Sequence, residues 1–131
     1  MSTEIEAVKL FFAALNRNDL QAIVLALDPE VVRKEFEGTP NGATYRGIGE
    51  FREMFERGRG SWAEGGCNPE EIFQNGNKVV AFVHVRVRLK GATEWNEGKI
   101  GDAFMFRGGK IVEFHSFADR DDALKWAGIA Q

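Results

Sequence analysis

The spacing of apolar residues changes once along this chain of 131 residues, and the change separates a helical part from a sheet part. Before Gly66 the apolar residues recur every three or four positions, as in amphipathic helices. Beyond it they alternate with the two-residue period of strands. The helical pattern covers residues 3–17, 20–27 and 47–57. The strand pattern covers residues 69–74, 78–90, 94–107 and 110–118, with a further short strand predicted at 31–36 and a last helix at 121–127.

Glycine-containing turns between the later strands predict antiparallel hairpins. The turns are Asn75-Gly76-Asn77, Lys90-Gly91-Ala92 and Arg107-Gly108-Gly109. Residues 38–45 contain Pro40, Asn41 and Gly42 and are expected to form a loop. Helices first and strands later, in a chain short enough for one domain over residues 1–131, predict an α+β fold with a curved antiparallel sheet and helices packed on one face.

Composition narrows the classes of partner and compartment. The net charge of −3 and the absence of a long basic run argue against nucleic acid as a partner. No stretch approaches the ~20 apolar residues of a membrane span, and the start MSTEIEAVKLFF is unlike a signal peptide. Cys67 is the only cysteine, so no internal disulfide forms, and we expect a cytoplasmic protein.

The two histidines and the strand at 78–90 are the most distinctive polar features. His84 and His115 lack a clustered set of carboxylates, so no metal site is predicted. On the strand, Phe82, His84, Arg86 and Arg88 share one parity, and Val83, Val85 and Val87 share the other. Buried arginines need an acidic partner, so Asp102, Glu97 or an anionic ligand is expected to neutralise Arg86 and Arg88.

Three segments carry a family resemblance over nearly the whole chain: NDLQAIVLALDPEVV, YRGIGEFREMF and GGKIVEFHSFAD. Together with the order of elements, they resemble the nuclear transport factor 2-like superfamily, in particular its SnoaL-like and ketosteroid isomerase-like branches. The resemblance implies a single SnoaL-like domain whose helices and sheet enclose a cone-shaped pocket for a small-molecule ligand. Members of this superfamily include several kinds of enzyme and also non-catalytic binders.

The resemblance also implies a set of site residues. Glu35 falls at the proton-shuttling carboxylate of ketosteroid isomerases, and Asp102 falls at their protonated, hydrogen-bond-donating aspartate. Phe11 stands where those enzymes have an oxyanion-binding tyrosine. In the same register, we expect the pocket to be faced by Phe82, His84, Arg86, Asp102 and Phe104, and Phe55 to belong to its aromatic wall.

The register implies a subunit interface as well. Val83, Val85 and Val87 would face outward, with His115 on the same side, and would leave an apolar sheet face for a homodimer. Structural alternatives stay open for the polar residues. Asp102 could be a carboxylate paired with His84 or Arg86, and Glu35 could be a solvated charge at the end of a strand.

These residues predict a cofactor-independent enzyme that moves a proton on a small apolar molecule with a carbonyl group, as isomerases, cyclases and dehydratases do. Glu35 or His84 would be the base, Asp102 the donor to developing oxyanion charge, and Arg86 an orienting group. The alternative is a non-catalytic ligand-binding or assembly domain. Phe11, which has no hydroxyl group, favours that alternative.

Overall fold

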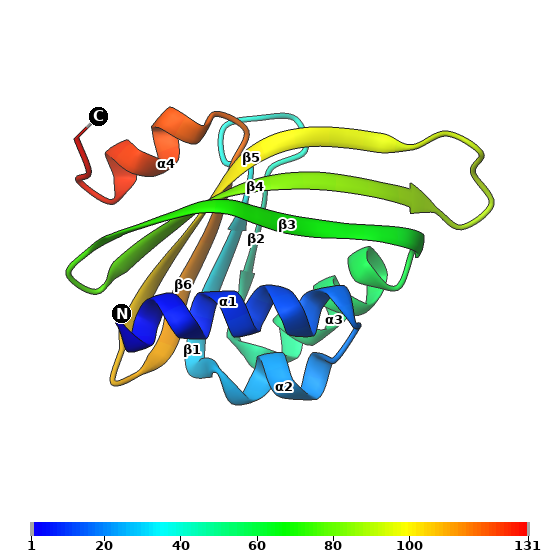
Figure 1. Ribbon diagram of the computed structural model, residues 1–131. Coiled ribbons are helices and arrows are strands. Elements are labelled where there is room, and N and C mark those ends of the chain that lie inside the picture. Colours follow the sequence, from blue (N-terminus) through cyan, green and yellow to red (C-terminus); the bar gives the residue numbers. More distant parts are fainter. Residues whose placement is uncertain (1, 131) are drawn as a thin grey trace.

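The computed structural model describes residues 2–130, which form four helices and six strands (Figure 1). The helices are α1 (Thr3–Asn16), α2 (Leu20–Leu25), α3 (Gly47–Arg59) and α4 (Arg120–Trp126). The strands are β1 (Leu27–Glu35), β2 (Ala43–Arg46), β3 (Trp62–Asn75), β4 (Lys78–Leu89), β5 (Asn96–Arg107) and β6 (Lys110–Phe117). No helix among the described residues is long and apolar enough to span a membrane.

Polar side chains begin the first two helices. The Ser2 hydroxyl accepts a hydrogen bond from the Ile5 amide at 3.0 Å, and Asp19 accepts one from the Ala22 amide at 3.1 Å. Each bond satisfies an amide that the first helical turn leaves without a partner. Gly60 follows the last residue of α3. A side chain at this position would lie 2.2 Å from the Glu56 carbonyl oxygen, so only glycine fits there.

The six strands form one curved, unclosed sheet in the order β2-β1-β6-β5-β4-β3. The three predicted hairpins are present, because β3, β4, β5 and β6 pair consecutively and antiparallel. The sheet is mixed rather than wholly antiparallel, since β1 pairs parallel with β6. The α+β class is confirmed, with this one parallel pair as the difference.

The sequence pattern misplaces some element boundaries. Residues 43–46 form the edge strand β2 rather than part of a loop, and they pair antiparallel with β1. This short strand contains no apolar run, so its alternation is invisible in the sequence. Strand β3 begins at Trp62, before Gly66, because its polar first half is held by backbone pairing to the far end of β4.

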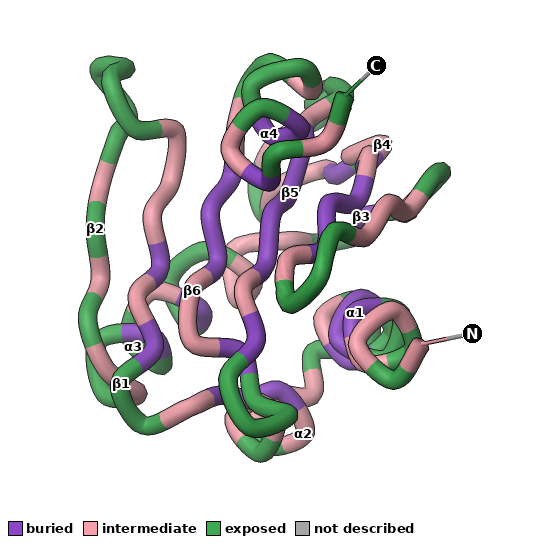
Figure 2. The backbone as a smooth tube through the Cα atoms, turned by 90° about the vertical axis from the view of Figure 1, so that its left-hand side faces the viewer, coloured by how far each residue is buried: buried purple, intermediate pink, exposed green. Residues whose placement is uncertain are grey.

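Helices cover both faces of the sheet. Figure 1 shows α1, α2 and α3 on one side and α4 on the other, and Figure 2 shows the buried strand segments between them. Val79, Ala81 and Val83 of β4 belong to the core beneath α1 and α3. Val80 lies in the smaller core with Leu124 of α4. We call the face toward α1 and α3 the inner face, and the face toward α4 the outer face.

The valines of β4 lie on the inner face, so the expected outward placement is wrong. Val83 is 0% and Val87 6% exposed, and partly buried Val85 packs against the main core. Pairing explains the reversal: Ala81 is opposite Asp102, so odd-numbered residues of β4 share a face with even-numbered residues of β5. The sequence prediction assumed that even-numbered residues of both strands share a face.

A side chain joins the end of α1 to the middle of β3. The Asn16 amide nitrogen donates to the Cys67 carbonyl at 2.8 Å, and the Cys67 amide donates to the Asn16 oxygen at 2.8 Å. Gly66 permits this approach, since a side chain there would lie 2.9 Å from the same oxygen. The pair of bonds fixes α1 against the inner face, where the cavity described below lies.

We predict that Asn16→Ala lowers the free energy of unfolding by about 2 kcal/mol, because both backbone groups of Cys67 lose their partner in a partly buried place. Urea unfolding followed by circular dichroism measures the change. Asn41→Ala, in the exposed loop, is the matched control and should change stability by less than about 0.5 kcal/mol. Equal effects of the two substitutions would contradict this role for Asn16.

Candidate functional site

A cavity of about 260 Å³ lies between α1, α3 and the inner face of the sheet. Its wall is largely aromatic and aliphatic. The aromatic members are Phe11, Phe36, Phe51, Phe55, Trp62 and Phe114. The lining residues able to take part in polar chemistry are Arg33, Glu35, Arg59, Cys67, Asp102 and Ser116. An apolar pocket with a few convergent polar groups is the usual form of a small-molecule site.

Strand pairing brings the polar residues of the cavity together. Glu35 of β1 is opposite Ser116 of β6, and Ser116 is opposite Asp102 of β5. The three side chains therefore form a row across three neighbouring strands on the inner face. Arg33, two residues before Glu35, shares that face and is opposite Phe114.

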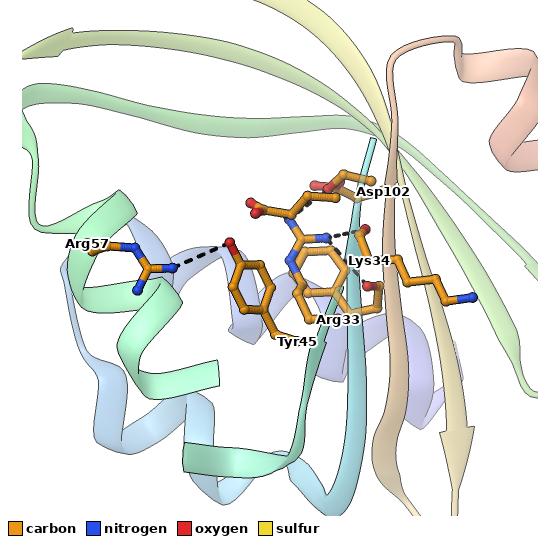
Figure 3. A network of polar contacts seen from close by, with 8 residues as sticks. Arg33, Lys34, Tyr45, Arg57 and Asp102 are labelled. Atoms are coloured by element: carbon orange, nitrogen blue, oxygen red, sulfur yellow. Dashed lines mark hydrogen bonds and ion pairs between the residues drawn. The ribbon is translucent and has the colours of Figure 1, made fainter. Parts of the chain in front are cut away.

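A chain of hydrogen bonds connects Arg33 to Asp102 (Figure 3). Arg33 Nη2 donates to Ser116 Oγ at 2.9 Å, and Ser116 Oγ donates to Asp102 Oδ1 at 2.5 Å. Arg33 Nη1 donates to the carbonyl oxygens of Lys34, at 2.9 Å, and Phe114, at 3.4 Å. The Arg33 guanidinium also lies 3.9 Å from the centre of the Phe114 ring. Glu35 Oε2 is 3.5 Å from Arg33 Nη2.

Burial dominates the electrostatics of Asp102, which is 4% exposed. Desolvation raises the pKa of this carboxyl to about 6, against the opposing effects of Arg33 and of the Ser116 hydrogen bond; Glu35 adds a smaller upward push. Burial also lowers the pKa of Arg33, while Asp102 and Glu35 raise it. Arginine stays charged in such a setting, so Asp102 is the group that changes charge near neutral pH.

Two polar residues predicted to face the pocket lie elsewhere. His84 Nε2 contacts Glu97 Oε2 at 2.5 Å, and the Arg86 guanidinium lies 3.8 Å from the centre of the Trp95 ring, about half exposed. Both are on the outer face, because even-numbered residues of β4 point away from Asp102. The prediction that they face the cavity is wrong. Arg88 is on the same face and pairs with Glu64 at 2.8 Å.

The predicted phenylalanines separate into three groups. Phe11 and Phe55 line the cavity, as expected. Phe104 faces inward but is fully buried in the core, stacked on Phe114 at 4.6 Å between ring centres. Phe82 is on the outer face, where it contacts Phe73 at 4.9 Å, so the prediction that it lines the cavity is wrong.

Arg33 and Ser116 are site residues that the sequence prediction missed. No role is assigned to Arg33 from the sequence alone. Its alternation with Glu35 was the available signal, because residues two apart on a strand share a face. Ser116 alternates with Phe114 in the same way. The sequence carries no sign that β1 pairs with β6 in parallel, which is the contact that brings these residues together.

Cys67 and His115 are two further groups with a reactive side chain. Burial raises the pKa of the Cys67 thiol to about 12, so it contributes a thiol surface to the cavity rather than a nucleophile. His115 is on the outer face as expected, but it contacts Trp126 of α4 at 4.9 Å between ring centres and Glu113 at 2.8 Å. It is therefore covered by α4 of its own chain, instead of serving a subunit interface.

One other hollow is a weaker candidate for a site. A hollow of about 330 Å³ between α1 and α2 is lined mainly by apolar side chains, and Arg17, which borders it, pairs with Asp19 at 3.1 Å. Within residues 2–130, no group of three or more His, Cys, Asp or Glu side chains is arranged to hold a metal ion.

Solved structures share this architecture. An NTF2-like protein of unknown function from Burkholderia pseudomallei superposes with a TM-score of 0.81 at 23% identity, over 97% of this chain and 98% of the other. The Mycobacterium tuberculosis protein Rv0760c, in complex with estradiol-17β-hemisuccinate, gives 0.80 at 13% identity, over 92% and 97%. An LEH-like epoxide hydrolase from M. tuberculosis gives 0.75 at 20% identity, over 95% and 89%.

Sequence comparison identifies the family. A search of curated proteins finds no match to the sequence. The model of the SnoaL-like domain matches residues 8–114, which extend from α1 to β6 and include Arg33, Glu35 and Asp102. The chain therefore belongs to the SnoaL-like domain family, and it shares the fold of the NTF2-like protein from B. pseudomallei.

Proposed function

We propose that this protein is a cofactor-independent catalyst of proton transfer, of isomerase, cyclase or dehydratase type, acting on a small apolar molecule with a carbonyl group. The observation that carries the proposal is the convergence of Glu35 and Asp102 on one apolar cavity. The positive charge of Arg33 lies in the same cavity lining. Acid-base catalysis uses one group that takes up a proton and another that donates a hydrogen bond to the developing charge. The cytoplasm suits a chain whose single cysteine is a buried thiol.

Asp102 is the proposed hydrogen-bond donor to the substrate oxygen. Its Oδ1 atom is taken by Ser116, so the Oδ2 atom is the one available to carry the proton. A carboxyl with a pKa of about 6 is protonated in half of the molecules at that pH. Negative charge developing on a nearby substrate oxygen raises the pKa further and strengthens the donor during the reaction.

Glu35 is the proposed base. It lines the cavity at the end of β1, and its side chain is 27% exposed, so it can exchange protons with solvent between turnovers. Arg33 contacts it at 3.5 Å and orients its carboxylate toward the cavity. His84 has no part in this proposal, because it lies on the outer face.

The second candidate function is ligand binding without turnover. Phe11 supports it, since the ring sits in the cavity wall without the hydroxyl that would give a substrate oxygen a second donor. The complex of the structurally similar Rv0760c with estradiol-17β-hemisuccinate is consistent with either candidate, because it establishes ligand binding for that protein alone. Measured turnover separates the two.

We predict that the protein accelerates exchange of the α-protons of 2-tetralone, an apolar enolisable ketone, in deuterated water. Glu35→Gln should lower kcat/KM by at least about 100-fold, and Asp102→Ala by about 100- to 1,000-fold. Above about pH 6 the wild-type kcat/KM should fall roughly tenfold per pH unit as Asp102 loses its proton. Proton NMR follows the exchange.

His84→Gln is the matched control, because it removes a titratable side chain from the outer face and leaves the cavity unchanged. It should retain full exchange activity. Binding of 2-tetralone without accelerated exchange would favour the non-catalytic candidate. Equal loss in the His84 and Glu35 variants would count against the cavity as the site.

We also propose a homodimer, formed through charged residues of the outer face rather than through the valines of β4. The outer face beyond α4 carries charged side chains that alternate in sign across strands, including Arg86, Arg88, Glu64 and Glu97. Trp95, 36% exposed, lies under the Arg86 guanidinium. A self-complementary arrangement of such pairs suits a two-fold interface between polar sheet faces.

We therefore predict a light-scattering mass of twice the 14.7 kDa chain mass at micromolar concentration in low salt. Salt of about 0.5 M should shift the population toward monomer, because it screens exposed charges. Arg86→Glu should weaken the dimer, and Arg57→Glu on α3 is the control on the opposite side. A monomer in low salt would overturn the proposal.

A further inference from the structure

Arg33 has more donor capacity than the protein uses. Of its five N–H groups, two bond backbone carbonyls and one bonds Ser116, while Glu35 is only within ion-pair distance. Among the described buried side-chain polar atoms, Arg33 Nε alone has no hydrogen-bond partner. A buried donor without a partner is costly, and active sites are where such groups are retained.

The charges around the cavity leave room for one more anion. Arg33 and Arg59 supply two positive charges, and Glu35 and Asp102 supply up to two negative ones. Arg59 bonds the carbonyls of Leu15 and Asn16, at 2.7 and 2.9 Å, and lies over the Trp62 ring. Among residues 2–130, no carboxylate forms an ion pair with it. When Asp102 takes up a proton, the cavity lining has a net positive charge.

The remainder of the cavity selects a flat apolar body. Phe51 and Phe55 stack with ring centres 6.5 Å apart on the α3 side, and Phe114 lies beneath the Arg33 guanidinium on the sheet side. A volume of about 260 Å³ falls just below the roughly 300–1,000 Å³ typical of pockets for drug-sized ligands. One or two fused rings with a short polar group fit these limits.

We propose that the ligand of this cavity is a small aromatic or alicyclic acid, whose carboxylate is bound by the Arg33 guanidinium, so that the proton on Asp102 stays available for the substrate oxygen. The inference rests on the proposed function and specifies its substrate class. Arginine is suited to this contact, because its planar donors match a carboxylate and stay charged when buried.

Binding of such an acid should be coupled to uptake of a proton. The charged and titratable groups that act on Asp102 are Arg33 and Glu35 on β1 and Cys67 on β3. Tyr45 on β2 acts on Arg33, and Arg59 on α3 acts on Cys67. Of these, Cys67 and the arginines keep their protons near neutral pH. A bound carboxylate disfavours the Asp102 anion and favours its protonated form.

Calorimetric titration with matched pairs tests the proposal on the unaltered protein. The probes are 2-naphthoate against 2-naphthamide and benzoate against benzamide, which differ in charge but hardly in shape. At pH 6 each acid should bind at least about tenfold more tightly than its amide. Between pH 6 and 8 the affinity for the acid should fall by up to about tenfold per pH unit, and that for the amide should stay constant.

Variants assign the effect to Arg33. Arg33→Met should bring the acid-to-amide ratio close to one, and Arg33→Lys should retain part of it. Arg57→Met removes the same charge from α3, where Arg57 bonds Tyr45 at 3.4 Å outside the cavity lining, and should leave the ratio unchanged. If the Arg33→Met variant does not fold, the comparison of acid with amide binding to the wild type alone tests whether the cavity prefers a carboxylate.

The possible results distinguish failure of the carboxylate inference from failure of the proposed function. Equal affinity for acid and amide would overturn the carboxylate inference and leave the proposed function standing. Failure of every acid and every amide to bind would count against the cavity as a small-molecule site, and so against both. A preference for the acid that survives Arg33→Met would place the anion elsewhere and overturn the inference.

Discussion

A guanidinium group buried between three strands must find its hydrogen bonds and its counter-charge inside the protein. Arg33 does so through two backbone carbonyls, the Ser116 hydroxyl and the nearby carboxylates of Glu35 and Asp102. Removal of either kind of partner would leave a buried charge without compensation, which is costly. The inner end of the cavity is therefore organised around Arg33, whose charge limits how far burial raises the pKa of Asp102.

The parallel pairing of β1 with β6 makes this arrangement available. It sets Glu35 beside Ser116 and Arg33 beside Phe114, and the antiparallel pairing of β6 with β5 adds Asp102 to the same row. The helices then enclose the row in aromatic side chains, with Asn16 and Arg59 holding the end of α1 in place. Burial by these helices is what raises the pKa of Asp102, so the packing of the core and the chemistry of the cavity are linked.

Much of this fold is readable from the sequence because it depends on local patterns. The change of period and the glycine turns predict the helices and the hairpins. The family resemblance implies Glu35 and Asp102 as site positions, and both residues line the cavity. The faces of β4 could not be predicted, since both parities contain apolar residues and the register with β5 depends on the lengths of the turns. The parallel contact of β1 with β6 joins residues some eighty positions apart, so neither Arg33 nor Ser116 had a local signal strong enough to mark it.

The pKa of Asp102, measured by carbon-detected NMR titration of its side-chain carboxyl, tests the central claim most directly. The account predicts a value near 6 in the wild type, raised above the ordinary 3.8 by burial, and a still higher value in Arg33→Met, because Arg33 opposes the shift. Since the folded state then binds the proton more tightly than the unfolded state, Asp102 should also reduce stability by about 2 kcal/mol as pH rises from about 4 to 6. A pKa near 3.8 that Arg33→Met leaves unchanged would contradict the account, because Asp102 would then be an ordinary carboxylate independent of Arg33.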